Sequence, residues 1–402
     1  MESDTIPIII DSGSKLTKAG LVNGVQPKVV FPSIVGRVRQ RSVYIKSGQK
    51  SAYVGKEAII KRGILNKRYP IIYGSVYNWD DMEKLWHHIF YDALKVMPEE
   101  HPFLLTVKPL TPSDDLRKTC QIMFETFNAP SLYLGNNASL SLFGANKTTG
   151  LVLQMGSSLN YAVPIVESQC LKSNIGVSGL GGILITEHLN EILATKGIKY
   201  FSHQELEHVR LMKEQYCSVL PIQKKEQNNL ELNESDHNFI KNQKAQLFDS
   251  TEFLSIDEKI VFCTEPLFSP QYAEKTIQKI QKSNDFSHLS KKPNFEIGLH
   301  QLCIETIHSL PKEKQEIMFQ NILLAGGHSM FKGFSDRLSN ELLSLFAESK
   351  QQINIIAPES RQFSSWLGAK KFASLNNFHD FCLTMDDYDE NGPYRGILKF
   401  NL

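Results

Sequence analysis

The sequence has 402 residues, which is long enough for two domains or two lobes with a large buried core. Hydrophobic residues make up 41% of it and charged residues 22%, as in ordinary globular proteins. Lysine and arginine (44) almost balance aspartate and glutamate (43), so the composition gives no reason to expect binding to nucleic acid or to a membrane surface. Because we find neither a signal peptide nor an apolar stretch of about 18 residues, we expect an intracellular, soluble protein.

Strands and glycine turns dominate the first part of the chain. Residues 6–35 alternate apolar runs with turns that contain glycine, which predicts consecutive β-strands and hairpins. Residues 36–66 are basic and polar and predict an exposed loop. Further on, we expect an amphipathic helix over 78–96 capped by Asn78 or Asp80, a strand over 103–107, and helices over 116–127 and 139–145.

The second part of the chain again begins with strands, over 149–154 and 161–166. Strands interleaved with helices favour an α/β protein over a helical bundle or a sandwich. Two polar segments interrupt this pattern. Residues 223–246, rich in Lys, Glu, Asn and Gln, predict a mobile surface loop, and residues 276–293 form a lysine-rich insertion with a weak helical pattern.

Cysteine usage is uninformative about metal binding. The six cysteines are widely scattered and form no C-x-x-C pair, which favours free, mostly buried thiols in a reducing compartment. They are Cys120, Cys170, Cys217, Cys263, Cys303 and Cys382.

An apolar run that ends in a glycine turn occurs three times, near residues 11, 154 and 326. Such a turn presents backbone N–H groups as a concave anion site, suited to phosphate. In the first copy Asp11 could hold a hydrated divalent cation, and Lys18 could neutralise phosphate charge. The second copy has Gln154 and no carboxylate. The recurrence predicts an internally duplicated fold with two facing phosphate turns, only one of which kept its acid.

Several long runs of the sequence resemble actin and the actin-related proteins over almost the full length. They are residues 30–37, 53–58, 61–65, 78–88, 98–102, 121–127 and 355–358. The resemblance implies an α/β, actin-like fold, of the type shared with chaperone ATPases and sugar kinases. Such a fold has two internally duplicated lobes and four subdomains around a nucleotide cleft.

The resemblance also implies a division of the chain. The first lobe would span 1–145, with an exposed small subdomain at about 36–70. The second lobe would span 146–345 and include the two polar segments, 223–246 and 276–293. Residues 346–402 would return to the first lobe.

The resemblance implies a binding site for ATP or ADP, with magnesium held through water by Asp11 if nucleotide is bound. Asp11 and Lys18 match the phosphate side, Arg210 and Glu214 match the ribose and base side, and Met330 lies in the adenine-side turn. The full implied set is Asp11, Ser12, Gly13, Ser14, Lys18, Gly156, Gly182, Arg210, Lys213, Glu214, Gly326, Gly327, Met330 and Phe331.

The hydrolytic half of this site departs from the family pattern. Asn137 replaces the glutamine that orients the attacking water, Gln154 replaces a cation-linked aspartate, and Ser157 replaces an aspartate of the second turn. Because phosphoryl transfer depends on positioning and electrostatics, we expect no catalytic residues and a degenerate ATPase site. Lys15 replaces a glycine of the first turn and either adds a cation to the phosphate site or obstructs it.

Two functions remain open at this point. The first is a divergent actin-related protein that serves as a structural subunit of a larger assembly, cytoplasmic and cytoskeletal, or else nuclear or ciliary. Its partners would be actin, other actin-related proteins and complex subunits, with no direct contact to nucleic acid or membrane. The alternative is a conventional actin-like ATPase that polymerises. A sugar kinase or chaperone of the same fold agrees less well with the matched runs.

Overall fold

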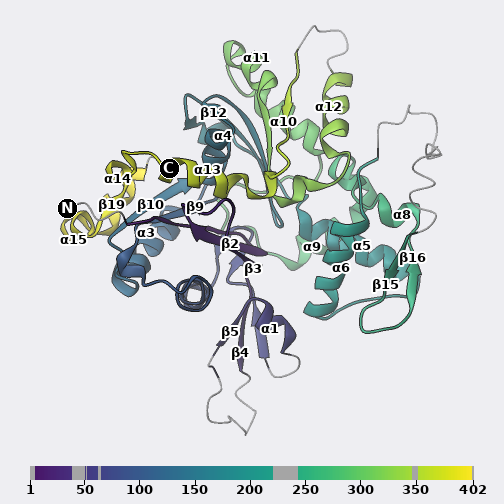
Figure 1. Cartoon of the computed structure of the whole chain (residues 1–402). Coiled ribbons are helices and arrows are strands. Elements are labelled where there is room, and N and C mark those ends of the chain that lie inside the picture. The colour runs from purple at the N-terminus through teal and green to yellow at the C-terminus, as the bar shows by residue number, and fades with distance from the viewer. Residues whose placement is uncertain are drawn as a thin grey trace.

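The computed structural model describes residues 5–38, 50, 52–61, 65–220, 243–345 and 352–400. Within these residues two six-stranded mixed sheets form the centres of two lobes (Figure 1). The sheets are covered by helices, which confirms the predicted α/β class.

The first sheet has the strand order β19-β10-β9-β1-β2-β3. Its strands are β1 (Ile8–Ser12), β2 (Leu16–Leu21), β3 (Val29–Pro32), β9 (Phe103–Val107), β10 (Ser131–Asn136) and β19 (Leu383–Thr384). The second sheet has the order β13-β12-β11-β17-β18, and β14 also pairs with β12. Its strands are β11 (Gly150–Met155), β12 (Asn160–Val166), β13 (Gln169–Cys170), β14 (Gly176–Ser178), β17 (Ile322–Ala325) and β18 (Ile355–Ile356).

The two sheets share one topology, as the recurring strand–turn pattern predicts. In each, a first strand pairs antiparallel with the strand that follows it and parallel with a strand from much later in the chain: β1 with β2 and β9, and β11 with β12 and β17. Asp11 and Gln154 are each the penultimate residue of the first strand. The duplication therefore places these two residues at equivalent positions.

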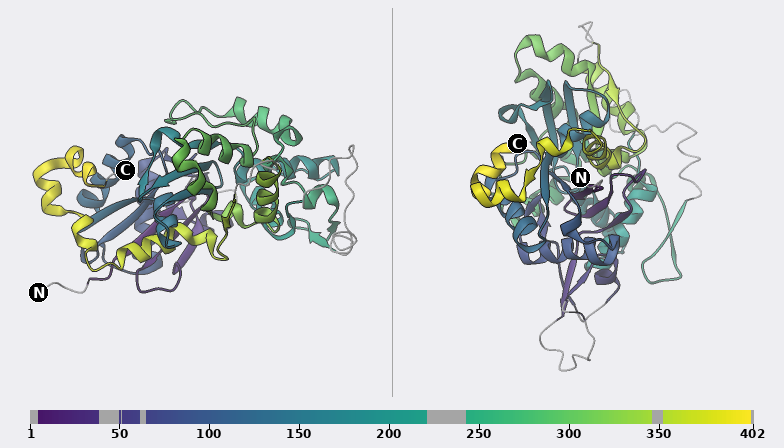
Figure 2. Two further views of the ribbon diagram at one scale, coloured as in Figure 1. Left: turned by 90° about the horizontal axis from the view of Figure 1, so that it is seen from above. Right: turned by 60° about the vertical axis from the view of Figure 1, so that its left-hand side comes forward.

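Helices pack on both sheets and fill the space around them. They are α1 (Lys56–Ile60), α2 (Trp79–His87), α3 (Ser113–Gln121), α4 (Asn137–Gly144), α5 (Gly182–Thr195), α6 (His203–Tyr216), α8 (Glu258–Val261), α9 (Glu274–Ser283), α10 (Leu299–His308), α11 (Lys312–Gln320), α12 (Phe334–Leu345), α13 (Ser364–Ala373), α14 (Phe378–Phe381) and the kinked α15 (Met385–Gly396). Figure 2 shows the C-terminal helices beside the first sheet, away from α5 and α6 of the second lobe.

The predicted helix over 78–96 is confirmed, with Asn78 as its cap. The Asp81 N–H donates to Asn78 Oδ1 at 2.8 Å, and α2 continues into a π-helix over His88–Leu94. The predicted helix over 116–127 begins earlier, at Ser113, and also ends in π-helical turns.

The prediction of an exposed loop over 36–66 is wrong for the residues that the structure describes there. β4 (Val35–Val38), β5 (Ala52–Val54) and β6 (Leu65–Arg68) form a small antiparallel sheet beside α1. Tyr53, Ala58 and Leu65 are buried together in this unit, which is enough for a small core of its own. Residues 39–49, 51 and 62–64 of the predicted loop lie outside the described residues.

The two polar segments of the second lobe contain regular structure among their described residues, and the weak helical pattern of the second one corresponds to a helix. Most of 223–246 lies outside the described residues, but β15 (Lys244–Gln246) pairs with β16 (Phe253–Ser255). The lysine-rich segment begins inside helix α9, which buries Thr276, Ile277 and Ile280. Its apolar positions three and four residues apart therefore anchor a real amphipathic helix against the second lobe.

A last short hairpin, β7 (Ile71–Ile72) with β8 (Ser75–Val76), lies in the first lobe.

Two crossing helices join the lobes. α4 follows the first sheet and leads into the second, and α13 packs against both α4 and β1. Trp366 in α13 is fully buried and donates its Nε1–H to the Ile9 carbonyl at 3.2 Å. Because β18 still pairs with β17, we propose that the chain returns to the first lobe at α13 and not at residue 346.

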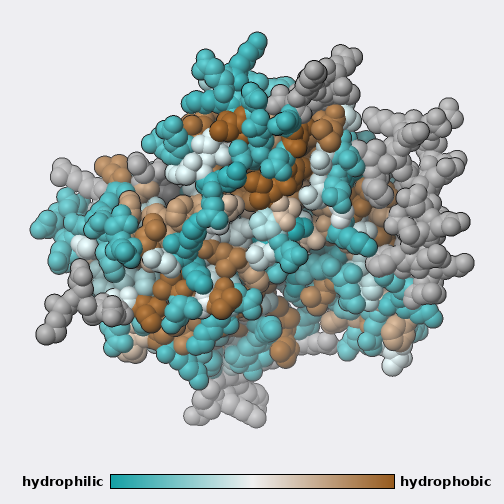
Figure 3. All heavy atoms as spheres, turned by 45° about the horizontal axis from the view of Figure 1, so that its top comes forward, coloured by the Kyte–Doolittle hydropathy of each residue, from teal (hydrophilic) through white to brown (hydrophobic). Residues whose placement is uncertain are grey.

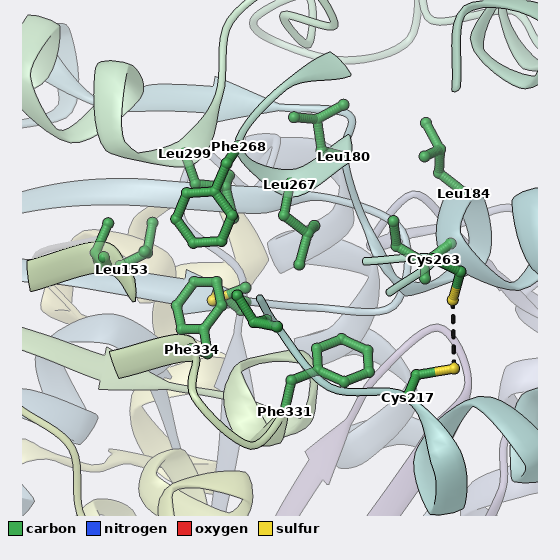
Figure 4. Close-up of a cluster of buried hydrophobic side chains, with 14 of the residues drawn as sticks. Leu153, Leu180, Leu184, Cys217, Cys263, Leu267, Phe268, Leu299, Phe331 and Phe334 are labelled. Carbon is green, nitrogen blue, oxygen red and sulfur yellow. Dashed lines mark hydrogen bonds between the residues drawn. The ribbon is translucent and has the colours of Figure 1, made fainter. Parts of the chain in front are cut away.

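The largest core lies in the second lobe and includes Phe268, Phe331 and Phe334 (Figure 4). The Cys263 thiol contacts Cys217 Sγ in this core at 3.3 Å. All six cysteines are free and five are buried, as predicted. Across the described residues, the structure contains no helix with the length and apolar character needed to cross a membrane.

Candidate functional site: a cavity between the two sheets

A cavity of about 770 Å³ lies between the lobes, within the size range of small-molecule sites. It is lined by every residue that the sequence predicts for nucleotide contact, from both lobes. Asn137, Gln154, Ser157 and Lys15 also line it. Residues that lie more than 300 positions apart in the sequence thus meet here.

The two glycine turns adopt the same geometry. The Gly13 N–H donates to the Leu16 carbonyl at 3.1 Å, and the Gly156 N–H donates to the Leu159 carbonyl at 3.1 Å. A Cβ atom at Gly13 would lie 3.0 Å from Leu16 O, and one at Gly156 would lie 2.7 Å from Leu159 O. Only glycine fits both turns without displacing backbone, so each lobe presents one tight turn to the cavity.

Asp11 in the first lobe is already neutralised by its neighbours. It is paired with Lys18 across β1–β2 and with Thr106 across β1–β9. Lys18 Nζ lies 2.9 Å from Asp11 Oδ2, and Thr106 Oγ1 donates to Asp11 Oδ1 at 2.6 Å. Both carboxylate oxygens therefore have protein partners.

Gln154, the equivalent residue of the second lobe, has an uncharged environment. Its strand neighbours are Tyr161 and Ala325. Gln154 Nε2 donates to Ser365 Oγ at 3.2 Å, and Ser141 Oγ lies 3.5 Å from Gln154 Oε1. The amide thus connects the second sheet to α4 and α13, the two helices that join the lobes.

Two buried polar atoms at the predicted phosphate end have no protein partner. They are Ser12 Oγ and Asn137 Oδ1, both from residues that line the cavity. Asn137 is the first residue of α4, and its neighbour Asn136 caps that helix through the N–H groups of Ala138 and Ser139. Buried orphan atoms of this kind are satisfied by water or by a ligand. They fit a polar ligand between the turns.

The predicted nucleoside end of the cavity contains a buried lysine. Lys213 Nζ donates to the Gly182 carbonyl at 2.8 Å and to Thr186 Oγ1 at 3.0 Å. Lys213 is only 5% exposed, so it is not a surface lysine that forms a solvated ion pair with Glu214. Glu214 instead forms an ion pair with Arg210, which also binds Glu207 at 2.6 Å.

The third glycine turn closes the same end. Gly326 has a φ of 91°, and a Cβ atom there would lie 2.1 Å from the Met155 carbonyl oxygen. A Cβ at Gly327 would meet no atom within 4 Å. Gly327 therefore leaves open space in the cavity, next to Met330 and Phe331, where a flat base could lie.

The pH dependence of stability should reveal the buried charge of Lys213. Burial lowers the pKa of Lys213 to about 8, while the pKa of the unfolded chain stays near 10.5. Between these values the unfolded state binds more protons, so Lys213 makes the free energy of unfolding rise with pH, by roughly 3 kcal/mol at most. Urea unfolding of the wild type and of Lys213→Met at pH 7–10 measures this contribution as their difference.

That difference should be constant below pH 8 and grow in favour of the wild type above it. The other titrating groups are the same in both proteins and cancel. Lys172→Met, which removes an exposed lysine, should follow the wild type at every pH. A difference that does not change with pH would contradict the buried, charged state of Lys213.

A divalent cation fits this cavity poorly. The described residues contain no group of three or more His, Cys, Asp or Glu side chains that could hold a metal ion. Asp11 is engaged by Lys18 and Thr106, and its counterpart Gln154 is neutral. A nucleoside phosphate fits the glycine turns and orphan atoms, but a magnesium ion would have to displace Lys18 from Asp11.

Sequence reasoning missed several residues of the cavity. Thr106 lies near the end of β9, the parallel neighbour of β1, and Lys108 directly follows that strand. Polar residues at the carboxyl ends of neighbouring strands are the signal that indicates them. Lys15 Nζ lies 4.0 Å from the Tyr69 ring centroid, and Tyr69 stacks on His203 of the second lobe. Lys15 therefore lies over Tyr69, a contact that no local pattern indicates.

Two sheets of one topology, each offering a glycine turn to a shared cavity, define a two-lobed α/β protein with a cavity between its lobes. A comparison with protein-family models matches residues 2–397 to the family described as actin. The chain belongs to the actin family. Members of this family bind adenine nucleotide with magnesium and are typically cytoskeletal.

Proposed function

We propose that this member of the actin family is a structural subunit of a larger protein assembly that binds ATP or ADP and hydrolyses ATP very slowly or not at all. The observation that carries the proposal is the environment of Gln154. At the position equivalent to Asp11, the second lobe has an amide held by Ser365, with no charge to align a cation or a water.

Asn137 and Ser157 add to this argument. Asn137 is one methylene shorter than glutamine, and Ser157 brings no charge to the second turn. Positioning and electrostatic stabilisation supply most of the rate of phosphoryl transfer, so loss of both should lower turnover by a factor on the order of a hundred or more.

Steady-state phosphate release at saturating ATP separates this function from a conventional polymerising ATPase. We expect a rate at least roughly a hundredfold below that of a conventional actin assayed in parallel. A rate within roughly tenfold of actin, together with self-assembly into long filaments, would refute the proposal.

We further propose that its partners are actin, other actin-related proteins or subunits of the same complex, in the cytoskeleton. Apolar patches on one face of the molecule support protein contacts (Figure 3). Affinity purification from native cells with quantification of stoichiometric partners tests this part. Recovery of the chain alone would contradict it.

A further inference from the structure

Lys108 places an ammonium group at the phosphate end of the cavity. It lies just beyond β9, whose Thr106 is in register with Asp11. A Cβ atom at Gly74 would lie 2.8 Å from Lys108 Cδ, so the glycine makes room for the lysine stem. The Gly74 N–H in turn donates to Ser14 Oγ of the first glycine turn at 3.0 Å. Gly74 therefore lies between Lys108 and Ser14 of the first glycine turn, the predicted phosphate site.

The Lys108 ammonium group donates hydrogen bonds to neutral groups, and the charge of Asp115 also acts on it. Lys108 Nζ donates to Ser75 Oγ at 2.7 Å and more weakly to the Tyr73 carbonyl at 3.3 Å. An ammonium group has three donors, so one remains for a ligand. Burial lowers the pKa of Lys108 to about 8, partly offset by the charge of Asp115, and the group is therefore cationic at neutral pH.

The charges around this end of the cavity favour an anion over a metal ion. Lys18 and Lys108 line the cavity together with Asp115, whose charge acts on Lys108, and Asp11 is paired with Lys18. A divalent cation would have to enter beside the ammonium groups of Lys18 and Lys108, with Gln154 in place of an acid. A polyphosphate, in contrast, would compensate the buried charge of Lys108.

We propose that Lys108 binds the terminal phosphates of the nucleotide, so that nucleoside polyphosphates bind this cleft without a divalent cation. The inference rests on the proposed function, because it assumes that adenine nucleotide is the ligand. It assigns to a lysine the neutralisation of phosphate charge that a metal ion supplies in metal-dependent sites.

The test compares ATP binding in excess EDTA and in excess magnesium, by titration calorimetry on the full chain. We expect affinities that agree within about threefold, since Asp11 is paired with Lys18 and the charge of Asp115 is compensated by Lys108. In EDTA, Lys108→Gln should weaken ATP binding by about tenfold or more and Lys108→Arg should largely restore it. Adenosine and pyrophosphate serve as separate probes: Lys108→Gln should leave adenosine binding unchanged and weaken pyrophosphate binding.

The glutamine of Lys108→Gln can still donate hydrogen bonds to Ser75 and Tyr73. If Lys108 has only a structural role, this variant should bind ATP like the wild type, and that result would overturn the proposal. Lys147→Gln removes an exposed lysine and is the matched control. A wild type that requires magnesium for ATP binding overturns this inference alone. Failure to bind ATP in either buffer overturns the proposed function as well. A second measurement does not depend on the folding of a variant: in EDTA, raising the salt concentration should weaken ATP binding to the wild type.

Discussion

Replacing Gly368 with alanine is expected to disrupt the junction of the two lobes. A Cβ atom at this position of α13 would lie 1.8 Å from the Leu140 carbonyl oxygen in α4. The opposing residue, Gly144, would place its own Cβ 3.0 Å from Gly368 Cα, so the two helices cross at backbone contact. Neither helix can move without disturbing Trp366 or Gln154, and we expect a loss of about 3 kcal/mol or more.

Thermal and urea unfolding of Gly368→Ala measure this effect. Gly327→Ala is the matched control, because the same added methyl group meets no atom within 4 Å there. It should unfold like the wild type, yet it should bind ATP more weakly, since its methyl group enters the cavity. Wild-type stability of Gly368→Ala would show that α4 and α13 do not pack as described.

Restoring the missing charges should restore hydrolysis. The triple variant Gln154→Asp, Ser157→Asp, Asn137→Gln places a carboxylate on each side of the second turn and a longer amide at the start of α4. We expect phosphate release to rise by about tenfold or more and to become dependent on magnesium, because the new acids can hold the ion.

Phosphate release with magnesium and with EDTA measures this gain. Gln169→Asp with Ser173→Asp adds the same charge at exposed positions and should leave the rate at the wild-type level. No increase in the triple variant would place the defect elsewhere, with Lys15 or the closure of the lobes as the next targets.

The strand–turn motifs could be predicted because each is local: an apolar run and a glycine turn lie together in the sequence. Their topology repeats in β1 and β11, and the family match agrees. The small sheet β4–β6 was missed because its strands are short and only Tyr53, Ala58 and Leu65 anchor them. Helix α9 looked polar because its three buried residues are outnumbered by lysine, glutamate and glutamine side chains.

Within the site, the identities of Asp11 and Gln154 were readable, but their partners were not. The Asp11–Lys18 pair depends on the register of β1 with β2, and the Gln154–Ser365 contact joins residues 211 positions apart. Lys108 carries no motif, and its role follows only from its place beside Gly74 and Ser14. Long-range contacts of this kind come from packing, which a local pattern does not contain.

The fate of ATP bound to the purified wild-type protein tests the central claim most directly. The protein is loaded with γ-labelled ATP, freed of excess nucleotide, and denatured at intervals, and the bound nucleotide is separated by chromatography. The account predicts stoichiometric binding and almost entirely intact ATP over hours. Rapid conversion of the bound ATP to ADP, or protein that binds no nucleotide, would contradict it.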